Sequence, residues 1–229
     1  MFRLVLALLL TALPFAWPAR AETALVQKQV MPLPAHRLVD GSYFPVQVSY
    51  ETYGRLNEER DNAILICHFF SGTSHAAGKY DPNDPQPGYW DAIIGPGKPL
   101  DTNKYFIVSS DILANLNAHD PRVKTTAPYS MEPTTRLPYA AQFPSITIRD
   151  MVNVQRALMH RLGIPYWHTV MGASLGGMQA LQWAVSYPDD VERVVTVAAS
   201  GRADAYNRAL CQLMIDAIRS DANWKNGAY

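Results

Sequence analysis

The chain contains only two cysteines among its 229 residues, Cys67 and Cys211. They could form one disulfide at most, which excludes a scaffold that depends on several disulfides for its stability. Cys67 lies within an apolar run, where a free buried thiol is a common state, so we favour two free thiols. Neither cysteine has the spacing of a metal-binding pair, and the sequence predicts no metal site.

Charge is also scarce. Charged residues make up 17% of the chain, and the formal net charge is zero. Without a basic excess or a run of like charges, the sequence does not favour a nucleic-acid partner or a polybasic membrane contact. Hydrophobic residues make up 48%, which is typical of a globular domain with its own core.

Long hydrophobic runs are missing outside the N-terminus. There, Arg3 precedes an apolar stretch over residues 4–13, which is too short to span a bilayer and has the length of a signal-peptide core. Ala19-Arg20-Ala21 matches a cleavage site. The sequence therefore predicts a signal peptide over residues 1–21 and an exported mature protein, periplasmic or secreted, with no membrane span after cleavage. An uncleaved membrane anchor is the less favoured alternative.

The rest of the chain alternates short apolar runs with segments of helical spacing. Unbroken runs typical of buried parallel strands occupy residues 63–67, 105–108, 169–171 and 194–197. Helical spacing covers 148–162, 178–187 and 203–220, and the alternating residues 46–53 predict an antiparallel strand near the sheet edge. This order predicts an α/β fold, a mostly parallel sheet with helices on both faces. Residues 78–143, rich in Pro, Asp, Asn and Gly, are predicted to form long loops at the top of the sheet.

The pentapeptide Gly172-Ala173-Ser174-Leu175-Gly176 stands between an apolar run and a helical segment. A G-x-S-x-G motif in that context predicts a nucleophile elbow, in which a tight turn presents the serine at the carboxyl end of a strand. The N-terminus of the following helix then stabilises developing negative charge. An ordinary glycine-rich turn is the alternative, which the strand and helix on either side make less favoured.

Several further stretches resemble the homoserine O-acetyltransferase family of the α/β-hydrolase fold, in the order in which that family has them. They are YETYGRLN (50–57), CH with SGTSH (67–75), GYWD with IGPGK (88–98), LDTNKYF (100–106), FPSITIRDMV (143–152) and DANW (221–224). Together with the GASLGG segment they cover nearly all of the mature chain, so the resemblance implies an α/β-hydrolase fold and serine-dependent acyl transfer.

The resemblance implies roles for three residues. Ser174 would be the nucleophile that forms an acyl-enzyme, and the backbone N–H groups of Leu175 and Phe70 would bind the oxyanion. His68 and His75 flank the Phe70 loop, but with no third ligand we interpret them as loop-packing residues. The partners would be a small-molecule acyl donor and acceptor, with no cofactor, and full-length members of the family commonly form homodimers.

The chain departs from the family pattern in the loop after the 105–108 run. Residues 115–121, NLNAHDP, replace a glycine-rich stretch that shapes the mouth of the site. An exported copy would also be separated from cytoplasmic acetyl-CoA. An exported serine esterase that uses water as acceptor therefore remains a second hypothesis. Leu175 replaces a methionine of similar volume, which should matter little.

All six histidines precede Ser174, whereas the triad order of this fold is serine, acid, histidine. The sequence therefore predicts a fold that is incomplete at the C-terminus, with a partial core over residues 22–200 and the start of a helical lid over 201–229. A catalytically incomplete remnant of a longer enzyme, without the triad acid and base, is the third hypothesis.

Overall fold

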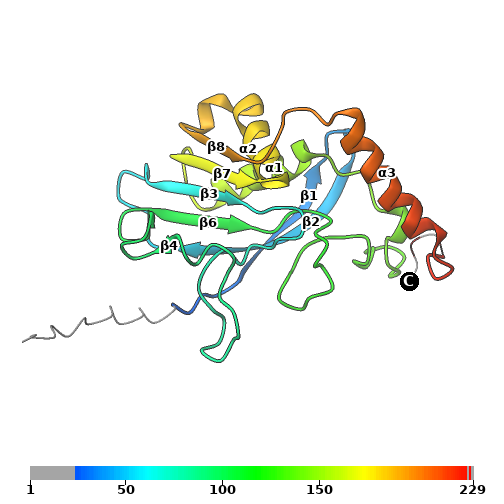
Figure 1. The fold of residues 1–229 in the computed structure, drawn as a ribbon, viewed down its shortest axis with the longest axis horizontal. Coiled ribbons are helices and arrows are strands. Elements are labelled where there is room, and N and C mark those ends of the chain that lie inside the picture. The colour runs from blue at the N-terminus through cyan, green and yellow to red at the C-terminus, as the bar shows by residue number, and fades with distance from the viewer. Residues whose placement is uncertain (1–23, 226, 228–229) are drawn as a thin grey trace, which may run out of the picture.

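A computed structural model describes residues 24–225 and 227 of the protein (Figure 1). The predicted signal peptide lies outside the described residues. Within them, no helix combines the length and the apolar character needed to cross a membrane. Cys67 is buried and Cys211 is exposed, and both are free thiols, as the sequence predicts.

A six-stranded sheet forms the centre of the molecule, with the strand order β1-β2-β6-β3-β7-β8. Strands β6, β3, β7 and β8 are mutually parallel. On one side of them, β2 pairs antiparallel with β6, and β1 pairs antiparallel with β2. The strands are β1 (Gln29–Arg37), β2 (Tyr43–Tyr53), β3 (Ala63–Cys67), β6 (Phe106–Ser110), β7 (Thr169–Ala173) and β8 (Val194–Val197). The mostly parallel sheet predicted from the sequence is therefore confirmed.

Strand β1 is absent from the sequence prediction. Its sequence QVMPLPAHR contains Pro32 and Pro34, which break the apolar alternation and withdraw two ladder donors. An edge strand tolerates this, since one of its sides makes no ladder bonds. With β1 on the outside, β2 is the second strand of the sheet and pairs on both sides.

Three α-helices accompany the sheet: α1 (Ile148–Arg161), α2 (Leu175–Ser186) and α3 (Ala205–Ser220). Helix α1 begins with a capping box, in which Thr147 and Asp150 bond to each other's backbone N–H groups. Helix α2 begins three residues before the predicted start because its first turn contains Gly176 and Gly177, which carry no apolar signal. Short 3₁₀ turns occupy Ala140–Gln142 and Pro188–Asp190.

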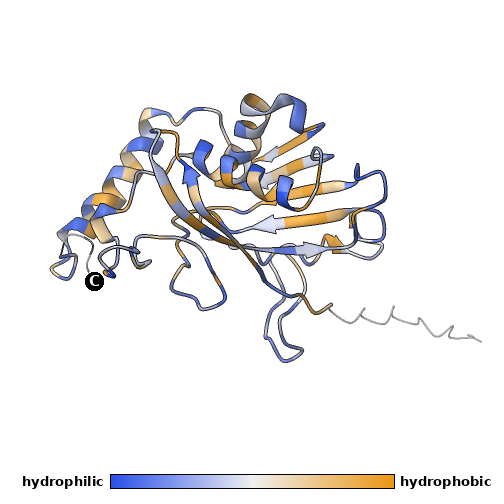
Figure 2. Cartoon of the chain, turned by 180° about the vertical axis from the view of Figure 1, so that it is seen from behind, coloured by the Kyte–Doolittle hydropathy of each residue, from blue (hydrophilic) through white to orange (hydrophobic). Residues whose placement is uncertain are grey.

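Both α1 and α2 pack on the same face of the sheet, against Leu65, Val108 and Val170. Figure 2 shows the apolar character of the central strands. In the described part of the chain, the other face is covered instead by the segment 76–105, which buries Ile64, Ile66 and Ile107. The prediction of helices on both faces is thus corrected for the described residues: well-packed loop residues such as Trp90 replace a helix there.

The loop segment predicted for residues 78–143 contains one strand of the main sheet, β6, as expected. It adds only the small pair β4 (Ile94–Gly95) and β5 (Leu100–Asp101). Beyond β8, helix α3 lies apart from the sheet (Figure 1), and none of its residues is buried. The proposed division into a core and the start of a lid remains a prediction.

Candidate active site

Ser174 occupies a sharp turn between β7 and α2, at the carboxyl end of the parallel strands. Its backbone has φ 54° and ψ −123°, a strained region for a residue with a side chain. The turn is held because the Ser174 N–H donates to Val197 O on neighbouring β8, at 2.9 Å, while Ser174 O accepts the N–H of Met178 at 3.1 Å. The side chain is exposed. The structure thus places Ser174 in a tight strand-to-helix turn, and its role as a nucleophile stays a prediction.

The two glycines of the motif are required by close backbone packing. A Cβ atom on Gly176 would lie 2.0 Å from Cys67 O, and one on Gly172 would lie 2.6 Å from the same oxygen. Strand β3 thus touches both the end of β7 and the first turn of α2. No side chain fits between them, so the spacing of the motif follows from how the three elements meet.

The two predicted oxyanion donors come from adjoining segments. Phe70 follows β3 and Leu175 follows β7, and the two strands pair directly, with Cys67 opposite Gly172. The ideal Cβ position of Gly176 lies 2.9 Å from His68 O, so the Phe70 loop begins against α2. Among the described residues, neither the Phe70 N–H nor the Leu175 N–H has a hydrogen-bond acceptor. Both are therefore free to bind an oxygen atom, although the role itself stays a prediction.

In the described part of the chain, the Ser174 hydroxyl has no histidine partner. His168 directly precedes β7 and so lies at the amino end of this strand, whereas Ser174 lies at the carboxyl end. Its Nε2 lies 3.0 Å from an Arg193 nitrogen. His75 lies 3.1 Å from Glu51. Among the described residues, no histidine side chain is bonded to Ser174, and the source of a general base stays a prediction.

His68 is buried under the Phe70 loop. Its Nδ1 lies 2.7 Å from Phe69 O, and its Nε2 lies 3.2 Å from Asn115 Nδ2. A carbonyl accepts and an amide donates, so the ring is neutral, with the proton on Nδ1. Burial lowers the pKa of His68, which outweighs the raising effects of the Phe69 carbonyl and Asp111. The prediction that His68 packs the loop is consistent with this arrangement.

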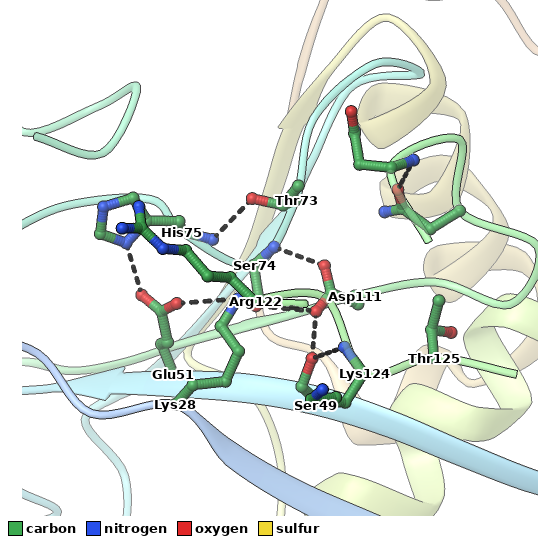
Figure 3. Close-up of polar contacts among 12 residues, drawn as sticks. Lys28, Ser49, Glu51, Thr73, Ser74, His75, Asp111, Arg122, Lys124 and Thr125 are labelled. Atoms are coloured by element: carbon green, nitrogen blue, oxygen red, sulfur yellow. Dashed lines mark hydrogen bonds and ion pairs between the residues drawn. The ribbon is translucent and has the colours of Figure 1, made fainter. Parts of the chain in front are cut away.

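A group of charged residues behind the same loop escaped the sequence prediction. We call Lys28, Glu51 and Asp111 the charged cluster; Figure 3 shows Lys28 between the two carboxylates. Lys28 Nζ lies 3.1 Å from Glu51 Oε1 and 3.8 Å from Asp111 Oδ2, and both carboxylates are fully buried. The one sequence signal was the position of Asp111, directly after a buried strand.

The buried Glu51 carboxylate is surrounded by donors. Burial by itself would raise its pKa, but His75, Lys28, Tyr80 and Tyr53 together hold the pKa below its usual range. Tyr53 and Tyr80 donate to its two oxygens at 2.7 and 2.5 Å. Glu51 is therefore an ionised structural anchor.

The remaining candidates offer little chemistry at Ser174. Burial raises the pKa of the Cys67 thiol to about 12, so it is a protonated core residue and no competing nucleophile. Residues 24–225 and 227 contain no group of three or more metal-ligating side chains. A cavity of about 1010 Å³ is lined by Tyr53, Lys98 and Thr102. It lies at the amino ends of the parallel strands, opposite the Ser174 edge.

Comparison with known proteins agrees with this fold. The family model for the alpha/beta hydrolase fold matches residues 62–228. The chain belongs to the α/β-hydrolase family. This α/β hydrolase is also 50% identical over 184 residues to a homoserine O-succinyltransferase of Magnetococcus marinus, which covers 80% of the chain and 45% of the relative. The resemblance inferred from the sequence is thereby confirmed.

Solved structures of similar proteins have the same fold. A homoserine O-acetyltransferase from Bacillus anthracis superposes with a TM-score of 0.88 at 46% identity, covering 90% of this chain and 56% of that chain. Esterase E22 superposes with a TM-score of 0.87 at 51% identity, with the same coverage. The α/β hydrolase described here spans about half the length of the curated relatives it matches.

Proposed function

We propose that this chain carries the nucleophile and oxyanion half of an acyltransferase of the homoserine O-acyltransferase type. The observation that carries the proposal is the turn at Ser174, a nucleophile elbow in our reading, with a strained backbone and an exposed hydroxyl. The similarity to homoserine O-acetyl- and O-succinyltransferases supports the reaction class.

The reaction follows from the geometry. Ser174 Oγ attacks the carbonyl carbon of an acyl donor, and the negative charge that develops on the carbonyl oxygen is bound by the free N–H groups of Phe70 and Leu175. Collapse expels the donor's leaving group and gives an acyl-enzyme. The hydroxyl of the acceptor then attacks the acyl carbon and restores Ser174. The base that takes the serine proton comes from outside the described residues.

The acceptor decides between two functions. A homoserine hydroxyl gives the acyltransferase, which the relatives' names favour, whereas water gives an esterase. The esterase is the second candidate because the chain is 51% identical to esterase E22 over 90% of its length. We also propose that the protein is exported, on the strength of the predicted signal peptide in residues 1–21.

The test supplies the missing base from solution. Small imidazole can substitute for a catalytic histidine, so we expect the chain to become acylated by p-nitrophenyl acetate when imidazole is added. Acylation is measured as a 42 Da gain in intact mass that tryptic mapping assigns to Ser174. The expected rate is far below that of a complete triad, since the oxyanion hole and binding alone retain only about 10³–10⁴-fold acceleration.

Ser174→Ala is the essential control and should remove both the mass gain and any rate above that of free imidazole. Ser200→Ala, an exposed serine after β8, should retain both. Adding homoserine should discharge the acyl-enzyme faster than buffer does if the acyltransferase is correct, and should have no effect for an esterase. A wild-type chain that is folded but never acylated at Ser174 would contradict the proposed function.

A further inference from the structure

The Phe70 loop, residues 68–75, is held along its length by the loop that follows β6. Asn115 Nδ2 donates to Gly72 O at 3.0 Å and contacts His68 Nε2 at 3.2 Å. Asn117 Nδ2 donates to Ser71 O at 3.0 Å. Asp111 accepts from Ser74, from its N–H at 2.8 Å and from its hydroxyl at 3.0 Å. Three side chains within seven residues thus hold four positions of the Phe70 loop.

Asn115 is the centre of this arrangement, and it is only 3% exposed. Its amide nitrogen donates to a carbonyl and to a neutral imidazole, and its Oδ1 accepts the N–H of Asn117 at 2.7 Å. Only an amide side chain combines two donors with an acceptor in this way. An aspartate of the same shape would place oxygen against the Gly72 carbonyl and would lose both donated bonds.

The far end of the loop is anchored by the charged cluster. Lys28 donates to Ser74 Oγ at 2.8 Å, and Ser49 donates to Asp111, so the carboxylate that holds Ser74 is itself fixed from β2 (Figure 3). His75 contacts Glu51 at 3.1 Å. The loop is therefore pinned on both sides of Phe70, while none of these contacts uses the Phe70 N–H.

We infer that Asn115 is a positioning residue for the Phe70 N–H, which it fixes through Gly72 and the neutral ring of His68. The inference rests on the proposed function, because the Phe70 amide matters for catalysis only if Ser174 acylates. An oxyanion donor stabilises the transition state only if it is oriented in advance. Phe70 lies inside a turn that the Gly72 N–H closes on Phe69 O at 2.8 Å, and Asn115 holds the Gly72 end of this turn from the loop after β6.

The test is Asn115→Asp, with Asn83→Asp as the matched control on an exposed loop. Two readouts need no catalysis. Amide hydrogen exchange of Gly72 and Ser74, whose N–H groups bond to Phe69 O and Asp111, should accelerate at least tenfold in N115D, while exchange in β3 and β7 stays unchanged. The ¹⁵N spectrum of the His68 ring should show the proton on Nδ1 in the wild type and a protonated Nε2, facing the new carboxylate, in N115D.

The third readout is the imidazole-supported acylation of Ser174. In N115D its limiting rate should fall by roughly tenfold, less than the 10²–10³-fold for complete loss of a donor, while the half-saturating ester concentration stays the same. N83D should match the wild type throughout. If N115D does not fold, Asn117→Asp takes its place, because Asn117 holds the neighbouring Ser71 O from a more exposed position.

Unchanged exchange at Gly72 and Ser74 together with an unchanged His68 ring spectrum would overturn the inference. So would an acceleration of exchange spread evenly over β3 and β7, which would mean general destabilisation. A wild-type chain that never acylates contradicts the proposed function alone, since exchange and the ring spectrum would still decide whether Asn115 orders the loop.

Discussion

At the scale of single residues, Gly176 shows how the fold dictates the motif. Its ideal Cβ position lies 2.0 Å from the backbone oxygen of Cys67, which cannot move without displacing the central strand β3. We expect Gly176→Ala to destabilise the chain by about 3 kcal/mol, at the upper end for overpacking a close contact. The measurement is the free energy of unfolding in urea, followed by tryptophan fluorescence.

Gly201→Ala is the matched control, because a Cβ there meets nothing within 4 Å. It should leave the unfolding free energy within about 0.5 kcal/mol of the wild type, as surface substitutions usually do. If G176A proved as stable as G201A, close packing would not explain the glycine, and the motif would have to be explained by chemistry alone.

At the scale of elements, the N-terminal caps of α1 and α3 should contribute differently to the stability of the fold. Thr147 caps α1, and its partner Asp150 also accepts the N–H of Val39 at 2.7 Å, so this cap joins α1 to the segment after β1. Thr147→Ala should lower the free energy of unfolding by about 1 kcal/mol or slightly more. Urea denaturation of the variant measures this loss.

The comparison is Asp204→Ala, which removes the equivalent cap of α3, where Asp204 accepts the N–H of Asn207 at 2.8 Å. Because α3 buries none of its residues, its fraying should reduce helicity by circular dichroism without moving the unfolding midpoint followed by tryptophan fluorescence. Equal midpoint shifts in T147A and D204A would show that α3 is part of the cooperative unit, contrary to its exposure.

The elements also show what sequence could predict. The runs 63–67 and 194–197 coincide with β3 and β8, because an unbroken apolar run predicts a strand from local sequence alone. The prediction that 194–197 is buried is wrong for the described residues, since β8 is an edge strand with no buried residue. Strand β1 was not predicted because its two prolines interrupt the alternation of apolar and polar residues that is typical of a strand. The turn at Ser174 followed from a motif whose spacing is fixed by close packing. The partners of Asn115 and Asp111 lie some 40 residues away, and nothing local records such pairings.

At the scale of the whole molecule, acid should destabilise the fold in two steps. Burial lowers the pKa of His36 below its ordinary 6.5, although nearby Asp150 opposes the shift, and no described residue forms a hydrogen bond with the buried His36 Nε2. Burial lowers the pKa of His68 in the same way. The unfolded chain therefore binds these two protons first, and stability falls as the pH drops below about 6.5. Glu51 has a pKa below its ordinary 4.5, so the stability it contributes is present above that pH and is lost as the pH falls through the folded value.

The first step can be separated from the second by substitution. In urea titrations at several pH values, His36→Gln should reduce the decline between pH 7 and pH 5 and leave the part that His68 contributes, because a glutamine takes up no proton in either state. The steeper loss below about pH 4.5 should persist in H36Q, since Glu51 and its donors are untouched. His160→Gln, on the exposed end of α1, should keep the wild-type decline in both windows. If H36Q declined as the wild type does between pH 7 and pH 5, the first step would come from His68 and not from His36, and the buried Nε2 of His36 would carry no stability cost.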